Sequence, residues 1–145
     1  MEISSPAFED GEMMPKIFTC DGKSINPHLI ISATPENAQS LVLIMDDTDA
    51  PGGQFTHWVV WNIPPDTKDI PEGGFVEGSV EGINSAGRQG YTGPCPPSGA
   101  HRYFFNLYAL DILLSLSADS ERNELEAEMA DHIISEARLM AKYQR

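Results

Sequence analysis

The chain has 145 residues, and its 22 acidic and nine basic side chains give a net charge of −13 at pH 7. This balance argues against nucleic acid or an anionic membrane surface as a partner, because both are bound through clustered Lys and Arg. Hydrophobic residues make up 41% of the chain. Length and composition therefore predict one globular domain over residues 1–145, large enough to bury a core.

The N-terminal residues Met1–Pro6 contain neither a basic segment nor an apolar run, so we read no signal peptide there. No apolar stretch reaches the length needed to span a membrane. We therefore expect a cytoplasmic protein. In that compartment thiols stay reduced, and Cys20 and Cys95 are predicted to be free.

Short apolar runs between Pro- and Gly-rich breaks predict β-strands. Four runs are strong and a fifth is weaker, and in chain order they cover residues 29–31, 41–45, 57–63, 73–80 (the weaker one) and 102–110. The strong runs are apolar on both faces, which indicates strands that are covered on both sides. We therefore expect a β-sandwich with an additional layer over one sheet.

The additional layer is predicted to be a C-terminal helix. Residues 121–143 contain no Gly or Pro, and apolar residues such as Leu125, Met129 and Ile133 recur at helical spacing. Asp119 or Ser120 is the expected N-cap. His132 is interpreted as a histidine on the surface of this helix.

The most informative segment is Gly93–Tyr103, where prolines and glycines fix a loop that leads into His101, Arg102 and Tyr103. Asp47 ends an earlier strand and His57 opens another. Each of these segments lies where a strand meets a loop, which is where sites are commonly built. We expect a preformed pocket for a small anion.

Two alternatives use the same residues. Zinc could bind Asp47, His57, Cys95 and His101, but their spacing matches no compact zinc motif. Cys95 could be an activated nucleophile, yet the prolines that follow it supply no backbone N–H for an oxyanion hole. We expect no metal and no cofactor, and we interpret Cys95 as a small buried side chain.

Several motifs together give the chain a resemblance to the phosphatidylethanolamine-binding protein family, in its bacterial and archaeal, Raf-kinase-inhibitor-like (YbhB- and YbcL-like) branch. The matching pieces cover nearly the whole chain: Cys20–Gly22, Asn26–Leu29, Asp47–Pro51, His57–Pro64, Arg88–Tyr91, Gly93–Tyr103 and Tyr108–Leu110. The sequence departs from the usual family pattern at Thr48, His28 and Ile31, and at Ala141-Lys142-Tyr143, where Gly-Thr-Tyr is common.

The resemblance implies an antiparallel Greek-key β-sandwich with a C-terminal α-helix on one sheet. It also implies a pocket for phosphate-like anions, phosphoethanolamine among them, and places the following residues in its lining: Asp47, His57, Pro96, Pro97, His101 and Tyr103. Some lineages inhibit kinases or serine proteases, so a protein partner of that kind is one implication, and a homodimer is another.

At the level of charge, His57, His101 and Tyr103 are expected to donate hydrogen bonds to the anion. Asp47 is expected to orient His57 or to accept from a ligand amine or alcohol. Strand alternation places Arg102 on the opposite face, where we expect a structural pairing with Asp49. We favour a binding protein over an enzyme. Two rival interpretations stay open, a hydrolase or lyase that uses Asp47, His57 and His101, and a module that binds only proteins.

Overall fold

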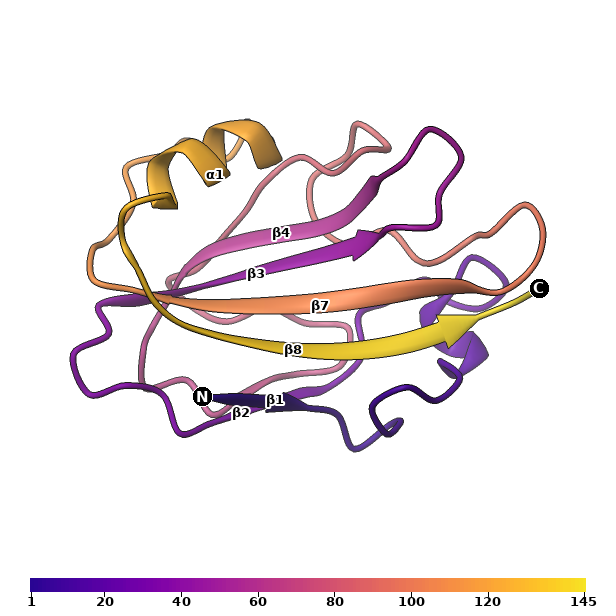
Figure 1. Ribbon diagram of the computed structural model, residues 1–145, viewed down its shortest axis with the longest axis horizontal. Helices are drawn as coiled ribbons and strands as arrows, with labels where there is room; N and C mark the ends of the chain where they lie inside the picture. The colour runs from indigo at the N-terminus through magenta and orange to yellow at the C-terminus, as the bar shows by residue number, and fades with distance from the viewer.

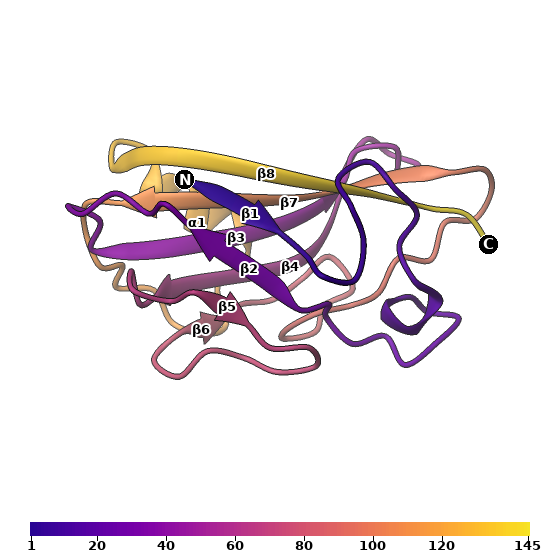
Figure 2. The same ribbon diagram turned by 90° about the horizontal axis from the view of Figure 1, so that it is seen from below.

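The computed structural model describes residues 1–145 as two antiparallel sheets and one α-helix. The smaller sheet has the order β1-β2-β5 and the larger one the order β6-β4-β3-β7-β8. Figure 1 labels the long strands and α1, and Figure 2 labels β5 and β6 as well. The elements are β1 (Glu2–Ser4), a 3₁₀ turn (Lys16–Phe18), β2 (Leu29–Ser32), β3 (Ser40–Asp47), β4 (Phe55–Ile63), β5 (Asp69–Ile70), β6 (Val80–Glu81), β7 (His101–Leu110), α1 (Arg122–Met129) and β8 (Ile133–Tyr143).

The four strong apolar runs of the sequence are strands β2, β3, β4 and β7, as predicted. The weaker candidate over residues 73–80 is a strand only at its last residue, Val80, where the two-residue β6 begins. Successive side chains of β3 and β4 point to opposite faces, and both faces are buried. The prediction that these strands are covered on both sides is therefore confirmed.

Two apolar clusters cover those faces. One lies between the sheets, which Figure 2 shows one behind the other, and it includes Leu43, Trp58 and Phe105. The other lies on the opposite face of the larger sheet, where Leu125 and Met129 of α1 pack with Val42, Ile44, Val59 and Trp61. The extra layer over one sheet is therefore a helix, as expected.

The predicted extent of that helix is wrong. Helix α1 ends at Met129, and residues 133–143 form strand β8, which pairs with β7 along its whole length. The N-cap is Glu121, within a capping box with Glu124, and not Asp119 or Ser120. His132 lies after the helix, where its ring bonds Asp111.

The physical reason is that strand pairing outweighs helical periodicity in this segment. Without β8, the long apolar strand β7 would be a bare sheet edge with unpaired backbone groups. The segment also alternates in the way a strand requires, because Leu139, Ala141 and Tyr143 are buried while Arg138 and Lys142 are exposed.

No helix in the structure is both long enough and apolar enough to cross a membrane.

Candidate functional site

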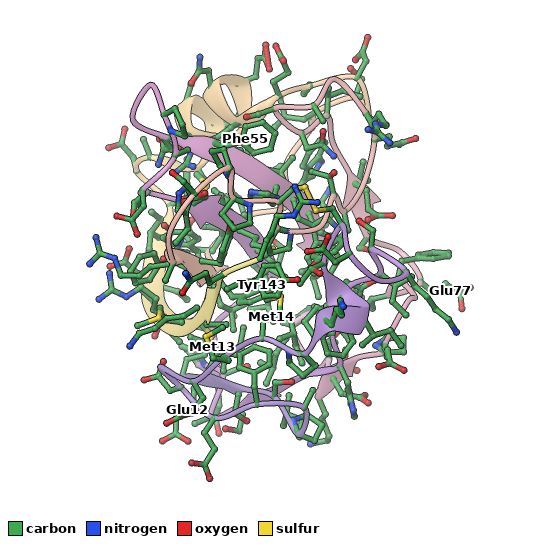
Figure 3. All side chains as sticks on the ribbon, turned by 90° about the vertical axis from the view of Figure 1, so that its right-hand side faces the viewer. Glu12, Met13, Met14, Phe55, Glu77 and Tyr143 are labelled. Carbon is green, nitrogen blue, oxygen red and sulfur yellow. A yellow bond between two sulfur atoms is a disulfide. The ribbon has the colours of Figure 1, made fainter.

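A cavity of about 380 Å³ opens at the end of the larger sheet where β3 ends and β7 begins. Figure 3 views the molecule from this end, where Phe55 at the start of β4 and Tyr143 at the end of β8 are labelled. The cavity is lined by Asp47, Ala50, Pro51, Phe55, His57, Thr92, Gly93, Cys95, Pro96, Pro97, His101 and Tyr103. All six residues that were expected from the sequence to line a pocket are in this lining, so the structure brings them together.

Strand register explains how these residues meet. Asp47 of β3 is the cross-strand partner of Tyr103 of β7 on one side and of Phe55 of β4 on the other. Along β7, His101 and Tyr103 point inward because side chains alternate, and Arg102 between them is exposed. The polar groups are deeply buried, with exposed fractions of 4% for Asp47, 5% for His57 and 7% for His101.

Asp47 and His101 form a buried pair. The His101 ring nitrogen Nδ1 lies 2.6 Å from Asp47 Oδ2, and the Asp49 backbone N–H donates to Asp47 Oδ1 over 2.8 Å. Because a carboxylate only accepts, Nδ1 carries the hydrogen and Nε2 has no hydrogen-bond partner within the chain. The expectation that Asp47 orients His57 was therefore wrong, since the carboxylate orients His101.

His57 is oriented by the backbone instead. Its Nδ1 lies 2.7 Å from the carbonyl oxygen of Thr92, and since that oxygen can only accept, Nδ1 is again the donor. Burial lowers the pKa of His57, although the Thr92 carbonyl and the charge of Asp47 oppose that shift. A neutral His57 offers only a lone pair at Nε2, whereas a protonated one donates there.

Tyr103 is a buried phenol with unused hydrogen-bonding capacity. The residue is 0% exposed, and its hydroxyl has no partner at normal hydrogen-bond distance, although the Asp47 carboxylate is near enough to act as a weak acceptor. Burial and the neighbouring charge of Asp47 raise the pKa of Tyr103, so the hydroxyl keeps its proton at neutral pH. The His57 ring stands edge-on to the Tyr103 ring at a centroid distance of 5.3 Å. An unpaired buried hydroxyl is costly to a fold. The other buried side-chain atom without a partner is Trp61 Nε1, which lies outside the cavity.

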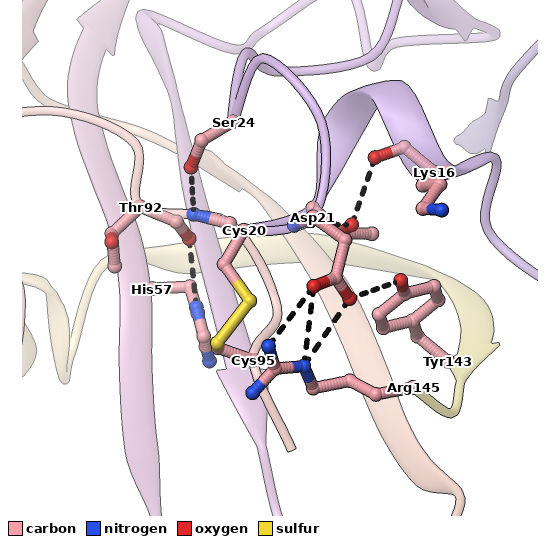
Figure 4. The surroundings of a disulfide bond; sticks show 11 residues. Lys16, Cys20, Asp21, Ser24, His57, Thr92, Cys95, Tyr143 and Arg145 are labelled. Carbon is pink, nitrogen blue, oxygen red and sulfur yellow. Dashed lines mark hydrogen bonds and ion pairs between the residues drawn. A yellow bond between two sulfur atoms is a disulfide. The ribbon is translucent and has the colours of Figure 1, made fainter. Parts of the chain in front are cut away.

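The wall opposite the strands is held by a disulfide between Cys20 and Cys95, shown in Figure 4. The prediction of two free thiols was wrong, as was the interpretation of Cys95 as a small buried side chain, because both cysteines are exposed and joined. The spacing of 75 residues hid the pairing, since proximity in the fold does not show in the sequence. A disulfide sulfur is neither a thiolate nucleophile nor a thiolate zinc ligand. No group of three or more His, Cys, Asp or Glu side chains is arranged to hold a metal ion.

Two hydrogen bonds reinforce the same wall. The Cys20 N–H donates to the Pro94 carbonyl over 3.0 Å, and the Gly93 N–H donates to Ser24 Oγ over 2.8 Å. A Cβ on residue 93 would lie only 2.7 Å from Ser24 Oγ and 2.8 Å from the Phe18 carbonyl oxygen, so this approach requires glycine. The disulfide and these two hydrogen bonds thus hold the loop that carries Pro96 and Pro97 in place.

Arg102 has the structural role that strand alternation predicted. Its guanidinium binds both carboxylate oxygens of Asp49, over 2.9 and 2.8 Å, and its backbone N–H donates to the same carboxylate. These bonds hold the pKa of Asp49 at about 2. Tyr143 does not line the cavity, because its hydroxyl donates to Asp21.

Sequence reasoning missed two contributors to the cavity, Phe55 at the mouth and Thr92, whose carbonyl sets the His57 tautomer. Phe55 could have been found, since it lies two residues before His57 and therefore on the same face of the strand. Thr92 contributes through its backbone, which carries no sequence signal.

The architecture defines a class: a small two-sheet β protein with a preformed, partly polar cavity at one sheet end. Comparison with known proteins agrees with that class and also identifies the family. Residues 4–144 match the sequence model of the phosphatidylethanolamine-binding protein family. The chain belongs to this family, in its bacterial and archaeal branch.

Relatives cover the full chain. A UPF0098 protein of Methanothermobacter thermautotrophicus is 45% identical over 100% of this chain and 99% of its own length. One from Aquifex aeolicus is 47% identical over 100% of this chain and 89% of its own length.

Two solved structures share the fold. A crystal structure of a putative phosphatidylethanolamine-binding protein homologue from Chlamydia trachomatis superimposes with a TM-score of 0.96 at 40% identity, covering 99% of this chain and 97% of that one. YbcL of Escherichia coli, described as a member of the mammalian family, gives a TM-score of 0.93 at 27% identity over 99% and 98% of the two chains.

Proposed function

We propose that the protein binds a small phosphate-bearing anion, phosphoethanolamine-like in its phosphate group, in the cavity between Asp47, His57 and His101. The proposal rests on the polar atoms of the cavity that have no hydrogen-bond partner within the protein. The Tyr103 hydroxyl has no partner at normal hydrogen-bond distance. In His57 and His101, Nδ1 is already hydrogen-bonded and Nε2 is not. A phosphate is an acceptor that needs such donors.

The geometry also implies that binding a phosphate requires a proton, either on a histidine or on the ligand. With both rings neutral, the hydroxyl of Tyr103 is the one side-chain donor among the three, and the two Nε2 atoms would face the anion with lone pairs. Binding a phosphate dianion therefore takes up a proton at His57 or His101, or else the ligand brings its own as a P–OH group. Asp47 sits behind His101 and accepts from its Nδ1 over 2.6 Å, so the contact of this ring with the anion falls to Nε2.

A kinase or protease partner, modulated through the same end of the molecule, is a further part of the proposal, and a homodimer is another. Both of these proposals are supported by family membership alone. A cytoplasmic location also stays a prediction. The free thiols that were predicted from this location are wrong, since Cys20 and Cys95 form a disulfide. Disulfides are rare in intracellular proteins, with those of hyperthermophiles as an exception.

Titration calorimetry with ethyl phosphate tests the binding proposal. We expect saturable binding by the wild type, at least tenfold weaker binding by His101→Ala, and little change in a control, His132→Ala, which alters a histidine that lines no part of this cavity. Equal affinity in wild type and His101→Ala would overturn the proposal.

The enzyme alternative has one favourable observation, the Asp47–His101 pair, because a carboxylate-oriented histidine can act as a general base toward water. A panel of phosphate and acyl esters separates the two functions. Turnover that disappears in His101→Ala would identify a hydrolase, whereas binding without turnover is the result we expect.

A further inference from the structure

A second hollow of about 540 Å³ adjoins the cavity, and His101 lines both. The two are framed by the same pair of loops, the one that follows β3 and the one that precedes β7. The lining of this second hollow is Asp49, Ser98, Ala100, His101, Arg102 and Lys142. A ligand whose phosphate sits against His101 and that extends past the ring would enter this hollow.

The hollow is locally cationic in a strongly acidic protein. It holds two of the nine basic residues of the chain, Arg102 and Lys142, and one carboxylate, Asp49. The bidentate bond to Arg102 neutralises Asp49. Lys142 is exposed and has no ion-pair partner within 4 Å. One positive charge outside any ion pair therefore shares this hollow with His101, although the chain carries −13 overall.

Lys142 is the direct cross-strand neighbour of Arg102 in the β7–β8 ladder. Asp49 already pairs with Arg102, so Lys142 stands opposite a neutralised ion pair. Glu12 meets Lys142 through a backbone hydrogen bond, and no carboxylate oxygen lies within 4 Å of the Lys142 ammonium. This charge is therefore free to attract an anion in the hollow.

We propose that this hollow is a second anion subsite and that Lys142 selects ligands with two anionic ends. This inference rests on the proposed function. The preferred ligand is a phosphate monoester whose other end carries a carboxylate, and a phosphate monoester that ends in an amine is disfavoured. His101 and Tyr103 face the phosphate, and Lys142, with Arg102 beside it, faces the second anion.

Three probes that share a phosphate and differ at the other end test the inference: phosphoglycolate (carboxylate), ethyl phosphate (uncharged) and phosphoethanolamine (amine). For the wild type at low salt we expect phosphoglycolate to bind about threefold to fivefold tighter than ethyl phosphate, the size of an exposed ion pair, and phosphoethanolamine to bind more weakly. Lys142→Glu should reverse this order. The matched control is Lys68→Glu, which alters an exposed lysine just before β5 of the smaller sheet with the same change in net charge, and it should preserve the order.

The possible outcomes test the second subsite and the proposed anion cavity separately. If ethyl phosphate binds but the three probes have equal affinities, or if Lys142→Glu leaves their order unchanged, the second subsite is refuted while the anion cavity stands. If ethyl phosphate itself does not bind, the proposed function fails and the subsite with it. A reversal that appears equally in Lys68→Glu would assign the effect to overall charge and would refute the role of Lys142.

Discussion

Replacing Tyr103 with phenylalanine should make the free protein more stable and the ligand complex weaker. The hydroxyl is buried without a partner, and such a group costs a fold about 1–3 kcal/mol. Tyr103→Phe removes the oxygen and keeps the ring packing, so we expect a gain of about 1 kcal/mol in the free energy of unfolding. For a chain of this length that gain raises Tm by roughly 3 °C.

The same substitution removes a donor from the anion site. A hydrogen bond to a charged group contributes about 1.5–3 kcal/mol, so the dissociation constant for ethyl phosphate should rise about tenfold to a hundredfold. Thermal denaturation without ligand and calorimetry with ligand measure the two effects separately. Opposite signs of the two effects distinguish a group kept for binding from one kept for structure.

Tyr91 provides the matched control, because its hydroxyl donates to the Phe18 carbonyl over 2.7 Å. Tyr91→Phe removes a hydrogen bond that is already made and should destabilise the protein by about 1 kcal/mol. If Tyr103→Phe also lowers Tm, or if it leaves phosphate affinity unchanged, the reasoning about the unpaired hydroxyl is refuted.

Two further predictions concern the disulfide and His57. The Cys20–Cys95 bridge closes a separation of 75 residues, so the double variant Cys20→Ser/Cys95→Ser should lose about 4 kcal/mol in urea denaturation; an unchanged midpoint would show that the bridge constrains little. Because burial lowers the pKa of His57 below its unfolded value of about 6.5, the unfolded chain takes up a proton more readily, and stability should fall as the pH falls below that value. His57→Gln should reduce this loss between pH 7 and pH 5, and an identical pH profile in both proteins would contradict the assignment.

Much of the fold could be predicted because its signals are local. The apolar runs that became β3, β4 and β7 have a strand's length and composition, and their two apolar faces required layers on both sides. The segment after Met129 could not be assigned this way. Its apolar residues fit a helix and a strand about equally, and the choice depended on β7, more than twenty residues away, needing a partner.

The candidate site likewise has parts that local sequence predicts and parts that it does not. His101, Tyr103 and Asp47 were predicted from motifs at strand ends, and strand alternation correctly separated Arg102 from them. Which carboxylate orients which histidine could not be predicted, because it depends on the pairing between strands. The disulfide and the Thr92 carbonyl likewise arise from contacts between distant segments, which a single sequence does not encode locally.

The most direct test of the account follows the ring nitrogens of His57 and His101 by ¹⁵N NMR while inorganic phosphate is added. We predict that Nδ1 keeps its hydrogen in both rings throughout. At a pH where phosphate is the dianion, at least one Nε2 should change from an acceptor to a protonated donor as phosphate saturates the site. His28 and His132, which line no part of the cavity, should not respond. If neither Nε2 signal moves at phosphate concentrations that saturate other reporters, the anion does not bind where we place it.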